Sequence, residues 1–286
     1  MKHKFLVPIL TPFNADESVD YDALKKLTRA LLDDGADGIY AGGSSAECFL
    51  LTEEERKKTL ETVVAAADGA YVLAHIGCPG TKCALELARH AKRAGADAVA
   101  SVPPFYYAFP FEGVLSYYRD LAGVGLPVTV YSLPSTRRMS VAEYRALLSV
   151  NGVCGLKYTD GDYFVMQQII AATGAEIYSG KDECFLSALA AGAKGAIGTT
   201  FNFMLYKYKN IERLFREGKP DAALAEQTSA NAVTACLLEN NIMATSKYLA
   251  SLRYGVNLGG ARRPFLPLSE ENKKAALAVA ERELGF

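Results

Sequence analysis

The tetrapeptide Gly35-Ala36-Asp37-Gly38 returns twice along the chain, and this rhythm decides the fold. The later versions are Gly95-Ala96-Asp97-Ala98 and Gly192-Ala193-Lys194-Gly195. Each version follows a segment with helical periodicity and precedes a short apolar run. Because glycine accepts the left-handed conformation that ends many helices, each version predicts a helix that stops and a chain that turns into a strand.

Eight short apolar runs are predicted to be strands. They are mostly apolar on both faces and are separated by helical patterns, which is typical of a parallel sheet covered by helices. The runs are Phe5–Leu10, Gly38–Ala41, Tyr71–Ile76, Ala98–Val102, Val128–Tyr131, Val153–Lys157, Glu176–Tyr178 and Ala196–Gly198. Eight β–α units in about 215 residues predict an α/β protein with a (β/α)8 TIM barrel. A doubly wound open sheet is the alternative, disfavoured because no GxGxxG follows the first strand.

The helices have recognisable starts, and several of them follow the last strand. Thr52 and Ser140 each precede a glutamate at capping-box spacing, and Asp20 is a predicted N-cap. The late helices are predicted at Leu205–Arg216, Asp221–Leu238, Met243–Arg253 and Ser269–Leu284. Because no low-complexity linker intervenes, we expect a single domain over 1–286. Residues 1–218 would form the barrel, and 219–286 a helical extension packed on it.

Composition excludes several classes of protein. Of the 286 residues, 50% are apolar and 22% charged, as in globular proteins rather than disordered ones. The net charge of −1 gives no field to attract nucleic acid or an anionic membrane, and no apolar stretch is long enough to span one. Six cysteines without a CxxC pair and only three histidines argue against a metal site. Scattered cysteines in apolar settings predict small core residues in a reducing cytoplasm.

Polar residues at the carboxyl ends of the strands are the candidate site, because barrels of this kind place their active sites there. Lys157 closes an apolar run, where desolvation favours a neutral amine that can attack a carbonyl. The alternative is a structural lysine that reaches solvent or pairs with Asp160 or Asp162. Tyr131 is either a proton shuttle or a packing aromatic.

Three further groups near the strand ends have both a chemical and a structural interpretation. Ser44 and Ser45 follow two glycines, so the turn either binds an anion such as a carboxylate or is simply tight. Asp182 and Glu183 either bind substrate hydroxyls or stabilise the first turn of a helix, with a cap-like spacing from residue 179. His75 lies in an apolar strand and is interpreted as a core histidine.

Five segments in order, each at a predicted strand end, make the chain similar to the pyruvate-dependent class I aldolases, the family of N-acetylneuraminate lyase and dihydrodipicolinate synthase. The similarity extends over essentially the whole chain. The segments are Gly42–Glu47, Pro104–Tyr107, Val130–Pro134, Gly155–Asp162 and Tyr178–Glu183.

The resemblance implies a role for each matching residue. Lys157 corresponds to the Schiff-base lysine, and Tyr131 to the tyrosine that moves protons near the substrate carboxylate. Ser44 and Ser45 correspond to the pair that binds this carboxylate and completes the proton path, so that Ser44 counts among the catalytic residues. Tyr106 corresponds to a tyrosine that reaches into a neighbouring subunit's site, which implies a homo-oligomer, usually a tetramer.

Within the family, the pattern resembles the sialic acid branch. Thr159, Gly180, Asp182, Glu183 and Thr199 match positions that grip a polyhydroxy chain, for which hydroxyls and carboxylates are suited. The dihydrodipicolinate branch usually has an arginine two residues after the proline of the tyrosine segment.

The chain departs from the family at several positions. Thr136 occupies the place of the arginine just described, and arginines follow at 137 and 138. Ser45 replaces a threonine, Ala46 a glycine, and Thr199 the usual serine, which adds a methyl group at the tail site.

The resemblance therefore implies a lyase that cleaves N-acetylneuraminate to N-acetylmannosamine and pyruvate through an imine on Lys157, with no metal or organic cofactor. One alternative is another pyruvate-dependent 2-keto acid aldolase or dehydratase, such as 4-hydroxy-tetrahydrodipicolinate synthase. Another is a non-catalytic regulatory barrel that binds sugar acids. In each case the expected partners are small molecules and other copies of this chain, rather than nucleic acid or membrane.

Overall fold

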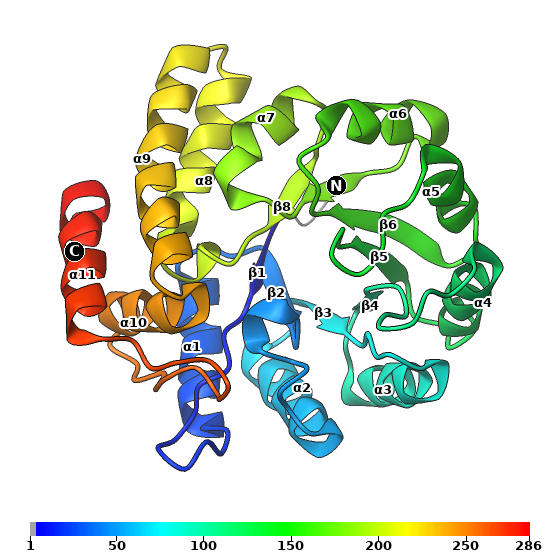
Figure 1. Ribbon diagram of the computed structural model, residues 1–286, viewed down its shortest axis with the longest axis horizontal. Coiled ribbons are helices and arrows are strands. Elements are labelled where there is room, and N and C mark those ends of the chain that lie inside the picture. Colours follow the sequence, from blue (N-terminus) through cyan, green and yellow to red (C-terminus); the bar gives the residue numbers. More distant parts are fainter. Residues whose placement is uncertain (1–3) are drawn as a thin grey trace.

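A closed barrel of eight parallel strands forms the centre of the computed structural model, which describes residues 4–286 (Figure 1). Each strand pairs with the next along the chain, and the last pairs with the first. The strands are β1 (Phe5–Pro8), β2 (Gly38–Ala41), β3 (Tyr71–His75), β4 (Ala98–Ser101), β5 (Val128–Ser132), β6 (Val153–Tyr158), β7 (Ile177–Ser179) and β8 (Gly195–Ile197). The predicted barrel is confirmed, and the open-sheet alternative is wrong.

In the described part of the chain, eight helices surround the barrel, one after each strand. They are α1 (Tyr21–Asp33), α2 (Glu53–Ala67), α3 (Thr81–Ala94), α4 (Phe111–Ala122), α5 (Val141–Leu148), α6 (Tyr163–Thr173), α7 (Phe185–Ala190) and α8 (Phe201–Arg216). Both predicted capping boxes form, at Thr52 and at Ser140, and Asp20 caps α1. Gly95 ends α3 in the left-handed conformation, with φ at 91°, as its tetrapeptide predicts.

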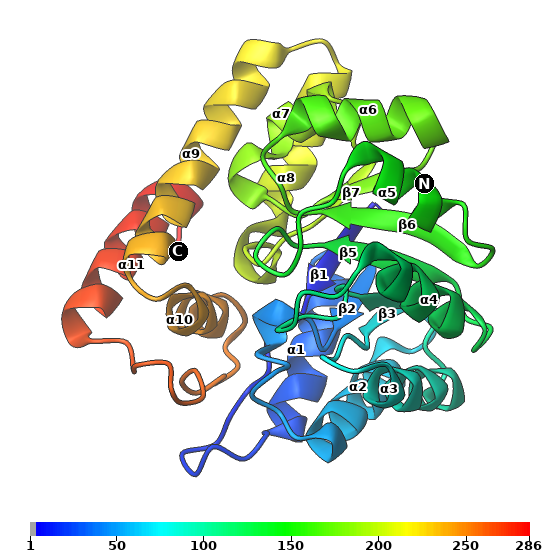
Figure 2. The same ribbon diagram turned by 45° about the vertical axis from the view of Figure 1, so that its right-hand side comes forward.

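Three more helices form a layer beside α8 and α1 (Figures 1 and 2). They are α9 (Pro220–Glu239), α10 (Ile242–Tyr254) and α11 (Glu270–Leu284). Their predicted bounds differ from the observed ones by at most one residue, whereas α8 begins four residues before the predicted Leu205. It includes a kink at Met204, a buried residue with φ of −139°. The division into a single domain stays a prediction.

The core has two main compartments, one inside the barrel and one between the strands and the helices, and a small third cluster of Phe13, Val19 and Leu51. Side chains that alternate along the strands fill the barrel interior, among them Leu6, Tyr40, Leu73 and Tyr131. The expectation that every cysteine is a core residue is wrong for Cys154, which is exposed because it lies near the amino end of β6. No helix in the described range, residues 4–286, has the length and apolarity to cross a membrane.

Candidate active site

Lys157 and Tyr131 are neighbours across the ladder between β5 and β6, near the carboxyl ends of both strands. They are direct partners in the parallel register, so their side chains leave the sheet on the same side. The Lys157 amine lies 4.2 Å from the centre of the Tyr131 ring. Lys157 is 5% exposed, so the side chain lies inside the barrel rather than in bulk solvent.

The carboxylates that a structural lysine would need are engaged elsewhere. Asp160 lies 3.6 Å from a guanidinium nitrogen of Arg138. Asp162 caps α6 and accepts a hydrogen bond from the backbone N–H of Val165. Within residues 4–286 no ion pair or hydrogen bond of the Lys157 amine is found. The alternative interpretation of Lys157 as half of a surface ion pair is therefore wrong.

Two further ring side chains, neither of them a predicted site residue, belong to the same cluster. The Tyr40 ring lies 4.9 Å from the Lys157 amine, and its buried hydroxyl has no hydrogen-bond partner among the described residues. His75 contacts Tyr40 and Tyr131 edge to face, with ring centres 6.0 Å apart in both pairs. The alternation of side chains along β2 could have identified Tyr40 as a residue of the barrel interior, because the residues on either side of it face the helices.

His75 is a neutral spacer in this ring cluster. Its Nδ1 lies 3.0 Å from the carbonyl oxygen of Gly42, which can only accept, so Nδ1 carries the proton. Burial lowers the pKa of His75 well below its usual value, and the Arg56 charge adds to this effect. The core interpretation of His75 is confirmed, although its Nε2 has no hydrogen-bond partner in the described chain.

The turn after β2 brings the two serines to the barrel mouth. Gly43 is required there, because a Cβ atom at this position would lie 2.4 Å from the Tyr40 ring. Ser44 and Ser45 follow in a 3₁₀ turn, η1 (Ser44–Ala46), whose right-handed backbone an alanine at position 46 adopts without strain. Ala46 is therefore compatible with the fold.

The two serines have different surroundings. Ser45 is buried, and its hydroxyl lies 2.7 Å from that of Thr199 after β8. The predicted carboxylate and tail positions therefore touch across the mouth. Ser44 instead lines a cavity of about 270 Å³ with Phe49, Leu50 and Phe265 among its walls.

Thr159 and Gly180 form a narrow cradle beside Lys157. A Cβ atom at Gly180 would lie 2.0 Å from Thr159 Oγ1 and 3.2 Å from Lys157 Cε. The Thr159 hydroxyl is buried without a hydrogen-bond partner among residues 4–286. Buried hydroxyls are rarely left without partners, so this group is available for a ligand.

Asp182 and Glu183 lie in a second 3₁₀ turn, η2 (Asp182–Cys184), and their carboxylates are not equivalent. Asp182 is buried, and its Oδ2 accepts hydrogen bonds from the backbone N–H and the hydroxyl of Thr200. Burial raises the pKa of Asp182 to about 6. Glu183 is half-buried and forms an ion pair of 2.9 Å with Lys181. The cap-like interpretation of residue 179 is wrong, since the turn has no side-chain cap.

Tyr106 is the one predicted site residue that lies away from the others. It is 87% exposed, and its backbone has a φ of 80°, in the left-handed region. Its ring contacts Tyr107 edge to face, with centres 5.0 Å apart. The protomer alone therefore does not bring Tyr106 to Lys157.

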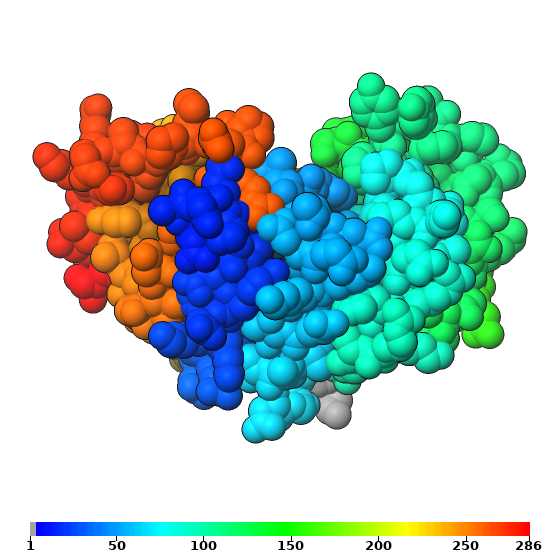
Figure 3. All heavy atoms as spheres, turned by 90° about the horizontal axis from the view of Figure 1, so that it is seen from below, coloured from blue at the N-terminus to red at the C-terminus, as the bar shows by residue number. Residues whose placement is uncertain are grey.

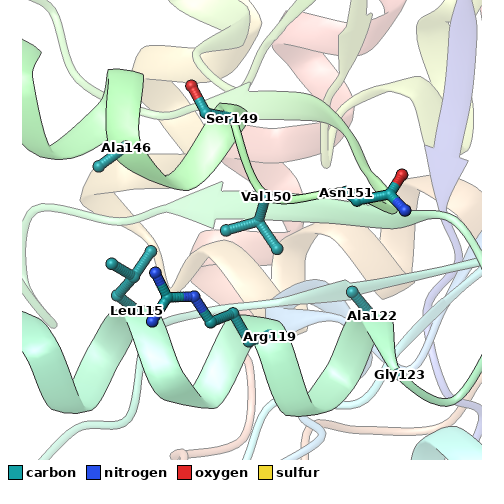
Figure 4. A pocket seen from close by; sticks show the side chains of 8 residues that line it. All are labelled: Leu115, Arg119, Ala122, Gly123, Ala146, Ser149, Val150 and Asn151. Atoms are coloured by element: carbon teal, nitrogen blue, oxygen red, sulfur yellow. The ribbon is translucent and has the colours of Figure 1, made fainter.

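The molecule is hollowed along the edge that carries the strand ends. Figure 3 shows this hollow at the top, between the orange C-terminal layer and the green middle of the chain. A separate cavity of about 560 Å³ lies between α4 and α5 and contains none of the predicted site residues (Figure 4). In residues 4–286 no cluster of three or more His, Cys, Asp or Glu side chains is arranged as a metal site.

Comparison with known proteins gives a consistent result. The model of the dihydrodipicolinate synthetase family matches residues 1–282. The N-acetylneuraminate lyase of Salmonella typhimurium is 37% identical over 283 residues, which are 97% of this chain and 95% of that protein.

Solved structures share the whole fold. CdNal of Clostridium difficile in complex with mannosamine superposes with a TM-score of 0.95 at 28% identity, over 99% of both chains. The dihydrodipicolinate synthase DapA-2 of Bacillus anthracis superposes with a TM-score of 0.93 at 28% identity, over 98% of both chains. Because the two TM-scores are so close, the fold alone does not separate the two activities.

Proposed function

The chain belongs to the dihydrodipicolinate synthetase family, and from this premise we propose that it is a Schiff-base lyase that cleaves N-acetylneuraminate to N-acetylmannosamine and pyruvate. The observation that carries the proposal is the position of Lys157. Its amine lies inside the barrel mouth, over two tyrosine rings, and forms no ion pair within residues 4–286. Such an amine is free to bond to a ketone, and the 37% identical lyase supports the choice of substrate.

The first step is formation of the imine. The Lys157 amine attacks the C2 ketone of the open-chain sugar acid, and the carbinolamine loses water. Ser44, Ser45 and the N–H groups of their turn hold the C1 carboxylate, because hydroxyls and backbone N–H groups donate to it. The protonated imine then withdraws electrons from C3.

The second step breaks the C3–C4 bond. Tyr131 gives its phenolic proton to the hydroxyl that leaves the carbinolamine as water, and the resulting phenolate accepts the proton of the C4 hydroxyl. The electron pair of the bond moves toward the imine nitrogen, and the aldehyde leaves. The resulting enamine takes a proton at C3, and water hydrolyses the imine to release pyruvate and Lys157. The position of Tyr131 on the same side of the ladder as Lys157 supports this role.

The tail of the sugar extends from Lys157 past the cradle of Thr159 and Gly180. The orphan Thr159 hydroxyl has hydrogen-bonding capacity for a sugar hydroxyl. The tail site is completed by Thr199, Asp182 and Glu183. Since Asp182 Oδ2 is engaged by Thr200, its contribution falls to Oδ1 and to holding the loop.

We also propose a cytoplasmic homotetramer in which Tyr106 enters the site of another subunit. The exposure of the Tyr106 side chain and the left-handed conformation of its backbone support a side chain that is held in position to contact another subunit.

Release of pyruvate from N-acetylneuraminate tests the proposal. We expect turnover with this substrate and much slower condensation of pyruvate with aspartate 4-semialdehyde. Condensation that is faster than cleavage would instead favour dihydrodipicolinate synthesis. Binding of the sugar acid without turnover would favour a regulatory barrel.

A further inference from the structure

Two thiols that the proposed reaction does not use lie side by side between β3 and α3. Cys78 follows the end of β3, and Cys83 is the third residue of α3. Their sulfur atoms are 2.8 Å apart, and both cysteines are free thiols. No other pair among the six cysteines, all of which lie in the described range, has this proximity. Because a disulfide bond measures about 2.05 Å, the sulfurs need to approach by less than one ångström.

The two thiols differ in access and in electrostatic setting. Cys83 is partly exposed and lies in the first turn of α3, where free N–H groups stabilise negative charge. Gly80 caps this helix without a side chain, so no capping oxygen competes for that field. The Glu53 carboxylate is 3.9 Å from Cys83 and opposes the effect, although Glu53 is itself paired with Lys57.

Cys78 is the inner partner. It is buried, and burial raises the pKa of its thiol to about 12. A guanidinium nitrogen of Arg56 lies 3.4 Å from its sulfur, and Arg56 also donates to the carbonyl oxygens of His75 and Gly77. The inner thiol is thus held in place next to the outer one.

We propose that Cys78 and Cys83 are a redox-modification site, at which a peroxide converts the two thiols into a reversible intramolecular disulfide. The Cys83 thiolate attacks a peroxide oxygen, breaks the O–O bond and becomes a sulfenic acid, with release of one water from hydrogen peroxide. The Cys78 sulfur then attacks the Cys83 sulfur, forms the S–S bond and displaces a second water. Two thiols and one hydrogen peroxide give one disulfide and two waters.

The disulfide would fix the turn between β3 and α3 in the shape that it already has. The carbonyl groups held by Arg56 frame this turn, and His75 connects it to the ring cluster around Lys157. The modification therefore lies directly behind the site without involving any of its reacting groups.

Peptide mapping of the full-length protein tests the site. The reduced protein is treated with hydrogen peroxide, free thiols are blocked with N-ethylmaleimide, and the chain is digested with trypsin without reduction. Cleavage after Lys82 places the two cysteines on separate peptides. We expect these two peptides to remain joined and to separate on reduction. The disulfide that joins them should form before the exposed Cys154 is oxidised.

Matched variants and a non-reducing gel complete the test. Cys83→Ser removes the joined peptides, whereas Cys154→Ser, which removes the most exposed thiol, leaves them unchanged. The expected product migrates as a monomer in the denaturing gel. N-ethylmaleimide on both Cys78 and Cys83 after oxidation, accumulation of a sulfinic acid at Cys83, or a covalent dimer joined through these residues would each overturn the proposal.

Discussion

Gly180 has no room for a side chain in the cradle beside Lys157. Its missing Cβ leaves the space in which Thr159 and the Lys157 side chain meet. We predict that Gly180→Ala lowers kcat/KM about 5- to 150-fold, since overpacking costs about 1–3 kcal/mol and about 1.4 kcal/mol corresponds to a factor of ten. Steady-state release of pyruvate measures this loss.

Gly161 provides the matched control for this change. It lies two residues after Thr159, and nothing approaches within 4 Å of the Cβ that an alanine would add. Gly161→Ala should therefore keep normal kinetics. Equal losses in both variants would show that the region is sensitive to any substitution and that the cradle has no special role.

The buried carboxylate of Asp182 makes stability depend on pH. Its pKa is raised from an ordinary 3.8 to about 6, so between these values the folded chain keeps a proton that the unfolded chain has released. Its contribution to stability is therefore fully present below pH 3.8 and is lost as the pH rises through about 6. The loss is of the order of 3 kcal/mol at most, since each pKa unit corresponds to about 1.4 kcal/mol.

Asp182→Asn removes the titrating group and keeps an oxygen to accept from Thr200. Urea unfolding at pH 4.5 and pH 7.5 should show that the variant gains stability relative to the unmodified protein as the pH rises. Parallel pH profiles of the two proteins would contradict the assignment of this titration to Asp182.

Residue-level prediction succeeds where strand position alone places a side chain. Lys157 and Tyr131 end their apolar runs, so a barrel necessarily directs both to one mouth. Tyr40 was not predicted as a site residue, because an aromatic residue in an apolar strand is typical of any core. The hydrogen bond from Thr200 to Asp182 could not be predicted, because it joins residues 18 apart through a loop geometry that no local pattern encodes.

At the scale of elements, a buried ion pair ties the turn after β2 to α10. Glu47 directly follows the serine turn with a left-handed φ of 56°, and its Oε1 lies 2.6 Å from the amine of Lys247. Both side chains are 0% exposed, and the Lys247 amine also lies 4.0 Å from the centre of the Phe13 ring.

Arg262 strengthens the same connection. Its backbone N–H donates to Glu47 at 2.7 Å, and its guanidinium binds both carboxylate oxygens of Glu55 at the start of α2. The C-terminal layer therefore holds the turn that carries Ser44 and Ser45.

We predict that Lys247→Met destabilises the protein by about 3–5 kcal/mol, because it leaves the Glu47 carboxylate buried and unpaired. Lys57→Met is the control, since ion pairs at the surface, such as those of Lys57 with Glu53 and Glu54, contribute little to stability. Urea unfolding compares the two. The double variant Glu47→Gln/Lys247→Met should recover part of the loss, and a Lys247→Met variant as stable as the control would contradict the prediction.

Helix boundaries were predictable where contacts between nearby residues set them, and unpredictable where contacts between distant residues do. The helix starts at Thr52 and Ser140 were predictable because capping bonds join residues three apart. The early start of α8 was not, because the chain before Leu205 is apolar and helical only through its packing at the top of the barrel. The C-terminal helices were visible as patterns, whereas their ties to the β2 turn depend on residues about 200 apart.

At the scale of the whole molecule, the prediction concerns Tyr106. If Tyr106 completes the site of another subunit, Tyr106→Phe and Lys157→Ala each reduce turnover. The two substitutions then remove groups that different subunits contribute to one site. Chains that carry the two substitutions, when unfolded and reassembled together, should therefore recover activity above either variant alone. Tyr107→Phe, at the exposed neighbouring tyrosine, should have little effect. A mixture no more active than its components would place Tyr106 outside the shared site.

The central claim is that Lys157 forms a covalent imine with a 2-keto acid, and trapping this imine tests it most directly. The protein is incubated with pyruvate and borohydride, and its peptides are mapped by mass spectrometry. The account predicts a single reduced pyruvate adduct on the peptide that contains Lys157, absent from Lys157→Ala, in which turnover is also nearly abolished. An adduct on a different lysine, or no adduct in a protein that still releases pyruvate, would contradict it.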